Sequence, residues 1–346
     1  MANSTRPSSD VGSKTLRDVA KRVGIHPATV SRALNESTRH LVRPETAIRV
    51  TEAAREIGYA PNSIARSLKT SRSLTVGVIL PDLTNPVFPP IVRGIEDALA
   101  PAGFTALLAN TDNDQARAHS VLQALRRRQV DGWISAVATL HDHLFTDAGA
   151  PLVLLSREDS AGTPAVVGDD RDGIAQVIAH LVALGHRRVA YLAGPQATST
   201  GASRFAAYEQ LAAARGLEVD AALVRFGNSF SELEGARTIG ELLDAGGDFT
   251  AVIAGNDMMA LGCYAMLTER GLRCPQDVSV VGFNDMRFAD RFAPPLTTVR
   301  IPHHEMGRRA AEQLLARIGG AVVAKGRIVL PAELVVRDST APPGGG

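Results

Sequence analysis

The sequence predicts a small helical N-terminal unit followed by a large α/β body built on parallel sheets. Two observations lead to this fold class. Within residues 15–34, apolar positions recur at helical spacing on both sides of a glycine. Beyond residue 74, short apolar runs of strand type alternate with helical stretches, as in parallel sheets covered by helices. The runs cover residues 76–80, 105–109, 132–136, 152–155, 189–193, 251–254 and 278–281.

The first helix is predicted to begin after Thr15. The Thr15 hydroxyl can cap the helix, and Asp18, three residues on, can reach back to the free amides. Gly24 is predicted to end the helix. One face is apolar and consists of Leu16, Val19, Ala20 and Val23.

The second helix has the composition of a DNA-reading helix. Pro27 suits its first turn, where the missing amide proton costs nothing, and Ile25, Val30 and Leu34 can pack on the first helix. The types on its exposed face reach base edges and phosphates. They are Ala28, Thr29, Ser31, Arg32 and Asn35. A plain helical hairpin without a DNA role is the alternative.

The balance of charged residues also differs between the helical N-terminal unit and the α/β body. Residues 1–73 carry 13 Lys and Arg against 6 Asp and Glu, whereas the remainder carries 24 against 30. A basic unit on an acidic body is expected when only one part meets phosphate. A basic surface helix bundle of another purpose is the alternative.

The segments TLRDVAKRVGIHPATVSRALN and YAPNSIARSLKT resemble the lactose/galactose repressor (LacI/GalR) family of bacterial transcription regulators. Further segments that resemble this family follow along nearly the whole chain. They are PDLTNPVF (81–88), VDGWI (130–134), VALGHRRVAYLAGP (182–195), AGNDMMALG (254–262) and VSVVGFNDMRFADRFAPPLTTV (278–299). The resemblance implies a three-helix helix-turn-helix head, a hinge helix, and a periplasmic-binding-protein-like body of two doubly wound subdomains.

The resemblance also predicts the domain boundaries. A disordered tail takes residues 1–13, the head 14–60, the hinge 61–73, the effector-binding and dimerisation domain 74–338, and a flexible tail 339–346. Subdomain 1 is expected at about 74–185 and 300–327, and subdomain 2 at about 186–299 and 328–338. The apolar run at residues 328–336 is expected to form one strand.

Residues 62–69 match the family's hinge helix, in which a leucine wedges into the minor groove. About eight residues make too short a helix to be stable alone, so it should order only on DNA. An ordinary linker is the alternative. The DNA-binding residues implied are Thr15, Leu16, Pro27, Ala28, Thr29, Ser31, Arg32, Asn35, Asn62, Ala65 and Leu68.

Three departures from the family pattern bear on function. His26 stands where the family usually has Ser or Thr, so phosphate contact or capping there becomes weaker or pH-sensitive. The loop between Asn35 and Val42 is about two residues longer than usual, and is expected to be solvated. Asn284 stands where the family most often has Asp, which removes one charge and alters which effector fits.

The resemblance places a small-ligand cleft at the strand ends of the body, where parallel sheets bring loops together. Asp257 and Arg204 are the first candidates to hold ligand hydroxyls or ring nitrogens. Phe88 and Phe230 are candidates for stacking, although Phe230 could equally be core. The remaining candidates are Arg157, Thr198 and Thr200. Asn256 is better explained as a helix cap, and Trp133 as core.

The mechanism implied by the family is operator binding by a homodimer, controlled by a small effector, with a carbohydrate that releases DNA as the expected case. A purine-like corepressor is the alternative, and so is a cytoplasmic ligand-binding protein of the sugar-binding type. The C-terminal region shows no heptad pattern for a tetramer, so a dimer is the default.

Other function classes find little support in the sequence. No enzyme is predicted, because LPDLTNPVF lacks a phosphate-binding glycine loop and no nucleophile has a matched base, and no cofactor is expected. Neither His141 with His143 nor His303 with His304 has zinc-site spacing, so no metal is expected. Without a signal peptide or membrane-length apolar run, the cytoplasm is the predicted compartment, with the two cysteines reduced.

Overall fold

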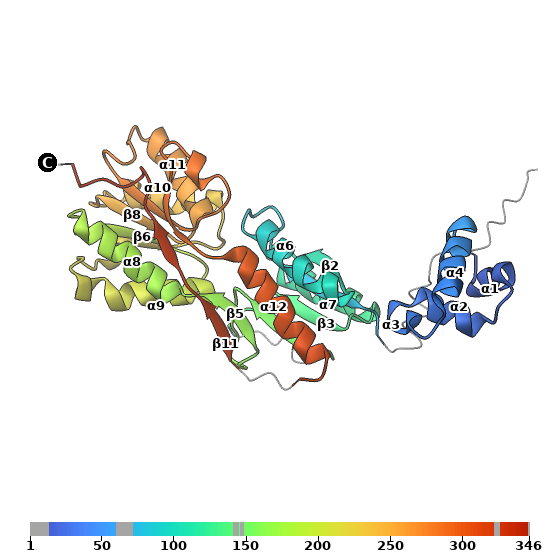
Figure 1. Ribbon diagram of the computed structural model, residues 1–346. Coiled ribbons are helices and arrows are strands. Elements are labelled where there is room, and N and C mark those ends of the chain that lie inside the picture. The colour runs from blue at the N-terminus through green and yellow to red at the C-terminus, as the bar shows by residue number, and fades with distance from the viewer. Residues whose placement is uncertain (1–13, 60–71, 141–144, 146–148, 322–325, 345–346) are drawn as a thin grey trace, which may run out of the picture. The chain divides into compact units, whose positions relative to one another are not determined.

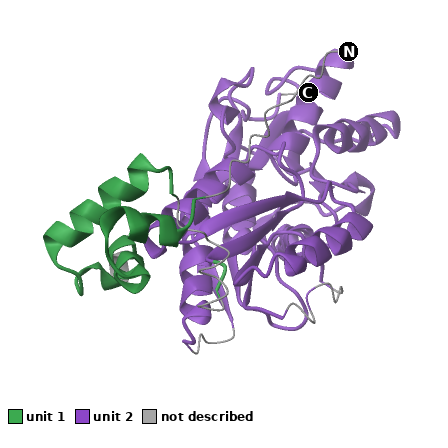
Figure 2. Cartoon of the chain, turned by 90° about the vertical axis from the view of Figure 1, so that its right-hand side faces the viewer, with its two compact units in different colours: residues 1–73 green, residues 74–346 purple. Residues whose placement is uncertain are grey.

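The computed structural model describes residues 14–59, 72–140, 145, 149–321 and 326–344. Figure 2 shows that the chain divides into two compact units, residues 1–73 and 74–346. The predicted tail at residues 1–13 and hinge residues 61–71 lie outside the described residues.

The first unit is a helical head around a small apolar core. Its helices are α1 (Leu16–Val23), α2 (Pro27–Leu34), α3 (Glu36–Arg39) and α4 (Pro44–Glu56). The Asp18 carboxylate accepts a hydrogen bond of 2.8 Å from the amide of Thr15, and Gly24 follows α1 with φ 75°. Val19 and Val30 are fully buried between the helices. The capping box, the end of α1 at Gly24 and both helices therefore form as the sequence predicts.

The loop expected after Asn35 is partly helical, which corrects the sequence prediction. The short helix α3 occupies Glu36–Arg39, and the Thr38 hydroxyl donates to the carbonyl of Arg32 over 3.1 Å. That contact fastens the extra residues to the end of α2. Arg39 and His40 remain exposed.

The body contains two six-stranded sheets, coloured from cyan to red in Figure 1. The first sheet has the order β11-β5-β4-β3-β1-β2, and all its strands are parallel. Its strands are β1 (Thr75–Leu80), β2 (Thr105–Asn110), β3 (Gly132–Ser135), β4 (Leu152–Leu155), β5 (Ala165–Gly168) and β11 (Arg327–Leu330). Its helices are α6 (Phe88–Leu99), α7 (Gln115–Arg127) and α12 (His303–Ile318), with the 3-10 turn η1 (Ala100–Ala102).

The second sheet has the order β12-β10-β9-β8-β6-β7, with only β12 antiparallel. Its strands are β6 (Val189–Ala193), β7 (Val224–Phe226), β8 (Ala251–Ala254), β9 (Ser279–Asn284), β10 (Thr297–Arg300) and β12 (Glu333–Val335). Its helices are α8 (Asp170–Ala183), α9 (Ser199–Leu211), α10 (Glu232–Asp244) and α11 (Asp257–Glu269), with η2 (Ala213–Arg215), η3 (Ala221–Leu223) and η4 (Ala289–Arg291). Each of the seven apolar runs singled out in the sequence overlaps a strand of one of the two sheets, and only residues 136 and 278 fall outside the strand.

The chain crosses between the subdomains three times, and the crossings differ from the predicted boundaries. The first follows β5, because α8 packs on α9, β10 and β12 rather than on the first sheet (Figure 1). The second lies between β10 and α12, and the third between β11 and β12. Residues 170–185 therefore belong to subdomain 2, whereas residues 328–330 belong to subdomain 1.

Residues 339–346 were expected to form a flexible tail, but the described part of this segment packs against subdomain 2 from Ser339 onward. Ser339 is fully buried, and its hydroxyl accepts a 2.8 Å hydrogen bond from the amide of Thr297 and donates to the carbonyl of Val280. The Ala341 amide donates to the Ser279 hydroxyl over 3.1 Å. The second subdomain therefore continues past residue 338 along β9 and β10.

Glycines allow the helices that carry cleft residues to pack closely. A Cβ at Gly94 of α6 would overlap the carbonyl of His304, and one at Gly307 of α12 would overlap the carbonyl of Ile91. The two helix backbones thus touch where a side chain would hold them apart. Trp133 is buried in the core beneath α7, as the sequence predicts.

Candidate effector cleft and DNA-reading helix

The polar residues of the cleft come from the carboxyl ends of parallel strands in both subdomains. Arg157 follows β4 in subdomain 1, while Asn256 follows β8 and Asn284 ends β9 in subdomain 2. Thr200 and Arg204 lie in the first turns of α9, after β6. These ends meet where the chain crosses between the subdomains, which is where ligands bind in open α/β sheets.

Two cavities share this region. The smaller, about 60 Å³, has a mostly uncharged lining and contains candidates from both subdomains. The larger, about 260 Å³, extends along α9 and β5 toward Arg327 and Val329. Both are lined by Ser156, Thr200, Arg204, Asn284 and His303.

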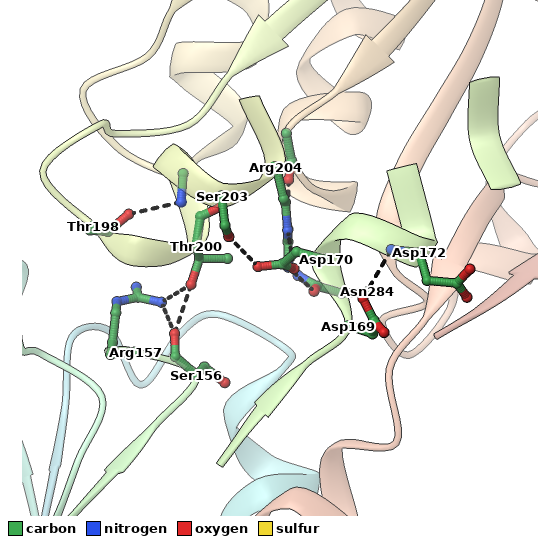
Figure 3. Close-up of polar contacts among 12 residues, drawn as sticks. Ser156, Arg157, Asp169, Asp170, Asp172, Thr198, Thr200, Ser203, Arg204 and Asn284 are labelled. Carbon is green, nitrogen blue, oxygen red and sulfur yellow. Dashed lines mark hydrogen bonds and ion pairs between the residues drawn. The ribbon is translucent and has the colours of Figure 1, made fainter. Parts of the chain in front are cut away.

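Arg204 is the most extensively bonded side chain at the cleft (Figure 3). Its Nε donates to Asp170 over 2.8 Å, one terminal nitrogen donates to the Gly255 carbonyl over 2.8 Å, and the other donates to Asn284 over 3.4 Å. Its guanidinium carbon also lies 3.7 Å from the centre of the Phe283 ring. Arg204 lines both cavities, but these contacts also fix α9 to β8, β9 and the first crossing.

Arg157 joins the two subdomains. Its Nη1 donates to the hydroxyl of Thr200 over 2.8 Å and to the carbonyl of Ser156 over 2.7 Å (Figure 3). The Thr200 hydroxyl also donates to the Ser156 carbonyl over 2.7 Å. The end of β4 and the first turn of α9 are therefore connected directly, and separation of the subdomains would break these bonds.

Asp257 lies behind the cleft and lines neither cavity. It is 1% exposed, and its carboxylate accepts hydrogen bonds from the amide of Met286 and the hydroxyl of Thr298. Burial raises the pKa of Asp257 to about 6, although both bonds oppose that rise. The described geometry thus gives Asp257 a position that ties α11 to β10 and to the segment after β9.

The other predicted ligand residues divide into two groups. Phe88 and Phe230 both line the smaller cavity, and Phe230 also packs against the apolar core of subdomain 2. Thr198 lines neither cavity. It caps α9 instead, because its hydroxyl oxygen accepts from the amide of Gly201 over 3.2 Å.

Of the cleft residues that were absent from the candidates favoured by the sequence, three had a signal in the sequence. Asn256 caps α11 as predicted, accepting from the Met259 amide over 2.9 Å, yet it also lines the smaller cavity. Asn284 and His303 line both cavities. The sequence carried a signal for each, since Asn284 ends a predicted strand and His303 follows one closely.

His303 lies at the start of α12, between the two cavities. Burial and the nearby Arg204 charge lower the pKa of His303 to about 4, while Asp285 acts in the opposite direction. The imidazole is therefore neutral at pH 7 and can both donate and accept hydrogen bonds in the cleft.

We expect His303→Asn to make stability less sensitive to acid. Because the folded pKa lies below the unfolded value near 6.5, the His303 contribution is complete above about pH 6.5 and declines as the pH falls toward 4. Between pH 7 and 5 the wild type should lose on the order of 1 kcal/mol more than His303→Asn. Urea unfolding at both pH values measures this difference. The exposed His119→Asn should behave like wild type, and equal acid sensitivity in all three proteins would refute the assignment.

In the head, α2 presents the predicted face to solvent. Ala28 and Arg32 are exposed and Thr29 and Ser31 partly exposed, whereas Val30 and Ala33 are buried. Pro27 begins this helix and Asn35 ends it. Thr15 is exposed at the start of α1, and Leu16 packs against the head core. The hinge candidates Asn62, Ala65 and Leu68 lie outside the described residues.

His26 takes over the capping role expected of Ser or Thr before α2. Its Nδ1 accepts a hydrogen bond of 3.1 Å from the amide of Ala28. Since only an unprotonated ring nitrogen accepts, protonation of His26 would remove this cap.

The described residues bring together no group of three or more His, Cys, Asp or Glu side chains that could hold a metal ion. His141 and His143 lie outside them. Within the same part of the chain, no helix combines the length and the apolar character needed to cross a membrane.

A helix-turn-helix head followed by a two-lobed α/β body with a ligand-sized cleft defines a class of ligand-responsive DNA-binding regulators. The model for bacterial regulatory proteins of the lacI family matches residues 15–62, and that for periplasmic binding protein-like domains matches residues 178–340. The transcriptional regulator RegA of Clostridium saccharobutylicum is 33% identical over 332 residues, covering 94% of this chain and 99% of RegA.

Solved structures agree with this assignment. The Lac repressor dimer bound to operator and an anti-inducer is 29% identical with a TM-score of 0.83, covering 95% of this chain and 99% of that one. The complex of the regulator CelR with cellobiose is 33% identical with a TM-score of 0.72, covering 94% and 99%. The chain belongs to the LacI family of bacterial transcriptional regulators, and its relatives are regulators rather than enzymes.

Proposed function

We propose that this protein is a repressor that binds a near-palindromic DNA operator as a homodimer and is released by a small effector, a carbohydrate, in the cleft. The observation that carries the proposal is the bonding of Arg157 and Ser156 in one subdomain to Thr200 in the other. A ligand that enters between these residues must change their hydrogen bonds, and it thereby changes the orientation of one subdomain relative to the other. The operator and the cellobiose in the two solved relatives support both halves of the proposal.

The first residues of the body couple the effector cleft to the hinge that binds DNA. Strand β1 begins at Thr75, immediately after the hinge, and the Leu74 amide donates to the Asp131 carboxylate over 2.6 Å. The end of the hinge is therefore fixed to subdomain 1. When that subdomain turns, the two hinges of a dimer change their separation, and a preference of about 5 kcal/mol for one state gives a near-complete switch.

Selection of binding sites from random DNA by the purified full-length protein tests the proposal. We expect enrichment of one near-palindrome, because a symmetric dimer reads two half-sites. A flexible pyrimidine–purine step is expected at its centre. If the protein needs a purine-like corepressor instead, a DNA sequence should be enriched only when nucleobases are present. Absence of any enriched sequence under both conditions would refute operator binding. With DNA as its partner, the protein is proposed to act in the cytoplasm.

The hinge wedge gives a separate prediction. Leu68→Ala should weaken operator binding while leaving effector affinity unchanged, because an apolar side chain between base steps acts only on DNA. Electrophoretic mobility shift and calorimetric titration measure the two affinities. Leu83→Ala, an exposed leucine of the body, serves as the matched control. Operator binding as strong in Leu68→Ala as in wild type would exclude the wedge.

A further inference from the structure

Arg157 is a buried cation without an anionic partner among the described residues. It is 9% exposed, and within the described part of the chain its guanidinium donates only through Nη1, to the carbonyl of Ser156 and the hydroxyl of Thr200. Both acceptors are uncharged. A guanidinium has five N–H donors, so the Nε and Nη2 groups remain free to donate. These two nitrogens form the edge that holds a carboxylate or phosphate with two parallel hydrogen bonds.

Among the residues that the structure describes, the lining of the smaller cavity, where Arg157 lies, contains no acidic side chain. Its charged members are Arg157 and Arg204, and the remainder are Asn85, Val87, Phe88, Ser156, Thr200, Phe230, Asn256, Asn284 and His303. Asn284 is the departure noted in the sequence, since it stands where the family most often has Asp. The described side of the cavity therefore offers cations and amides but no carboxylate to accept from sugar hydroxyls.

The carboxylates around the cleft are each bonded to other groups. Asp170 pairs with Arg204 over 2.8 Å. Asp285 pairs with Arg300 over 2.8 Å and with Arg337 over 2.6 Å. Glu158, next to Arg157 in the chain, pairs with Arg327 over 3.1 Å.

The charge of Arg157 is costly in the absence of ligand. Burial and the neighbouring Arg204 lower the pKa of Arg157 to about 10, while the Asp170 charge acts in the opposite direction, so the group is still protonated at pH 7. A buried charge that lacks a counterion destabilises the folded state, and a bound anion would remove that cost.

We propose that the effector carries an anionic group, a carboxylate or a phosphate, that binds the free edge of Arg157. An acidic sugar or a sugar phosphate has this chemistry, while its hydroxyls can meet Asn256 and Asn284. The inference rests on the proposed function, because it takes the smaller cavity as the effector site. An anionic effector differs from a neutral sugar such as the cellobiose bound by the solved relative CelR.

Calorimetric titration with matched pairs tests the inference. The pairs are glucose with glucuronate, ribose with ribose 5-phosphate, and cellobiose with cellobionate, all at one ionic strength so that general screening is equal. We expect the anionic member of at least one pair to bind ten times or more as tightly as its neutral partner. The carboxylate and phosphate pairs identify which anion is preferred.

Variants assign the preference to one side chain. Arg157→Gln should abolish the anionic preference, and Arg157→Lys should retain part of it. Arg270→Gln should leave it intact, because Arg270, just after α11, forms an exposed ion pair with Asp244 at the end of α10. A panel in which no anionic member exceeds its neutral partner would overturn the inference. Site selection on random DNA with the same preparation is a separate readout, so operator binding without anion preference would leave the proposed repressor standing.

Stability without ligand provides a second readout. Arg157→Met removes the unpaired charge and keeps an apolar stem of similar length, so its Tm should equal or exceed that of wild type. A lower Tm would mean that Arg157 is held for its bonds to Ser156 and Thr200, and would contradict the inference.

Discussion

Arg204→Ala is expected to lower the free energy of unfolding by about 3–5 kcal/mol, the range for breaking a buried ion pair from one side. The side chains of Arg204 and Asp170 are 7% and 15% exposed, so little solvent screens the pair. The substitution also removes the donor to the Gly255 carbonyl and the stacking on Phe283. Urea denaturation at pH 7 measures the loss.

A surface pair provides the control for this experiment. Arg270 and Asp244 lie 2.6 Å apart, but both side chains are exposed. Arg270→Ala should therefore cost only about 0–1 kcal/mol. If the two substitutions cost the same, Arg204 is not the anchor that holds α9 against β8 and β9.

Arg32→Ala should weaken binding to the selected operator by about 1–3 kcal/mol and affect random DNA far less. The reason is its place on the exposed face of α2, beside Ala28 and Thr29, where a guanidinium can pair with a guanine edge. Fluorescence anisotropy with operator and with scrambled DNA measures both affinities.

The exposed Arg55→Ala on α4 is a matched control for charge, since it removes one cation from the same head. Its effect should be smaller and alike on the two DNAs. Equal losses on operator and scrambled DNA for Arg32→Ala would show that Arg32 contacts phosphate rather than a base.

Local signals predicted the head and most strands, because each rests on a few neighbouring residues. The Thr15–Asp18 box, Gly24 and Pro27 fix both helices of the motif, and His26 proved to supply a cap of its own. The four-residue helix α3 is too short to show a periodic pattern. The apolar run at residues 328–336 was wrongly predicted as one strand, although Pro331 lies at the point where it divides between the two sheets.

The cleft was harder to predict, because sequence position does not fix the direction of a side chain. Asn256 and Asp257 are adjacent, yet Asn256 lines the smaller cavity while Asp257 is buried against Thr298 and the Met286 amide. Thr198 and Thr200 differ in the same way, since one caps α9 and the other faces Arg157. Which neighbour reaches the cavity depends on long-range contacts that the sequence pattern does not contain.

The coupling of cleft and operator is the central claim, and one titration tests it most directly. Operator affinity is measured by fluorescence anisotropy at rising concentrations of a compound that calorimetry has shown to bind the body. We predict that affinity falls as the cleft fills, with the midpoint set by the calorimetric Kd. A rise would indicate a corepressor instead of an inducer. Operator affinity that stays constant while the cleft becomes saturated would contradict the account, because the ligand would then bind both states equally.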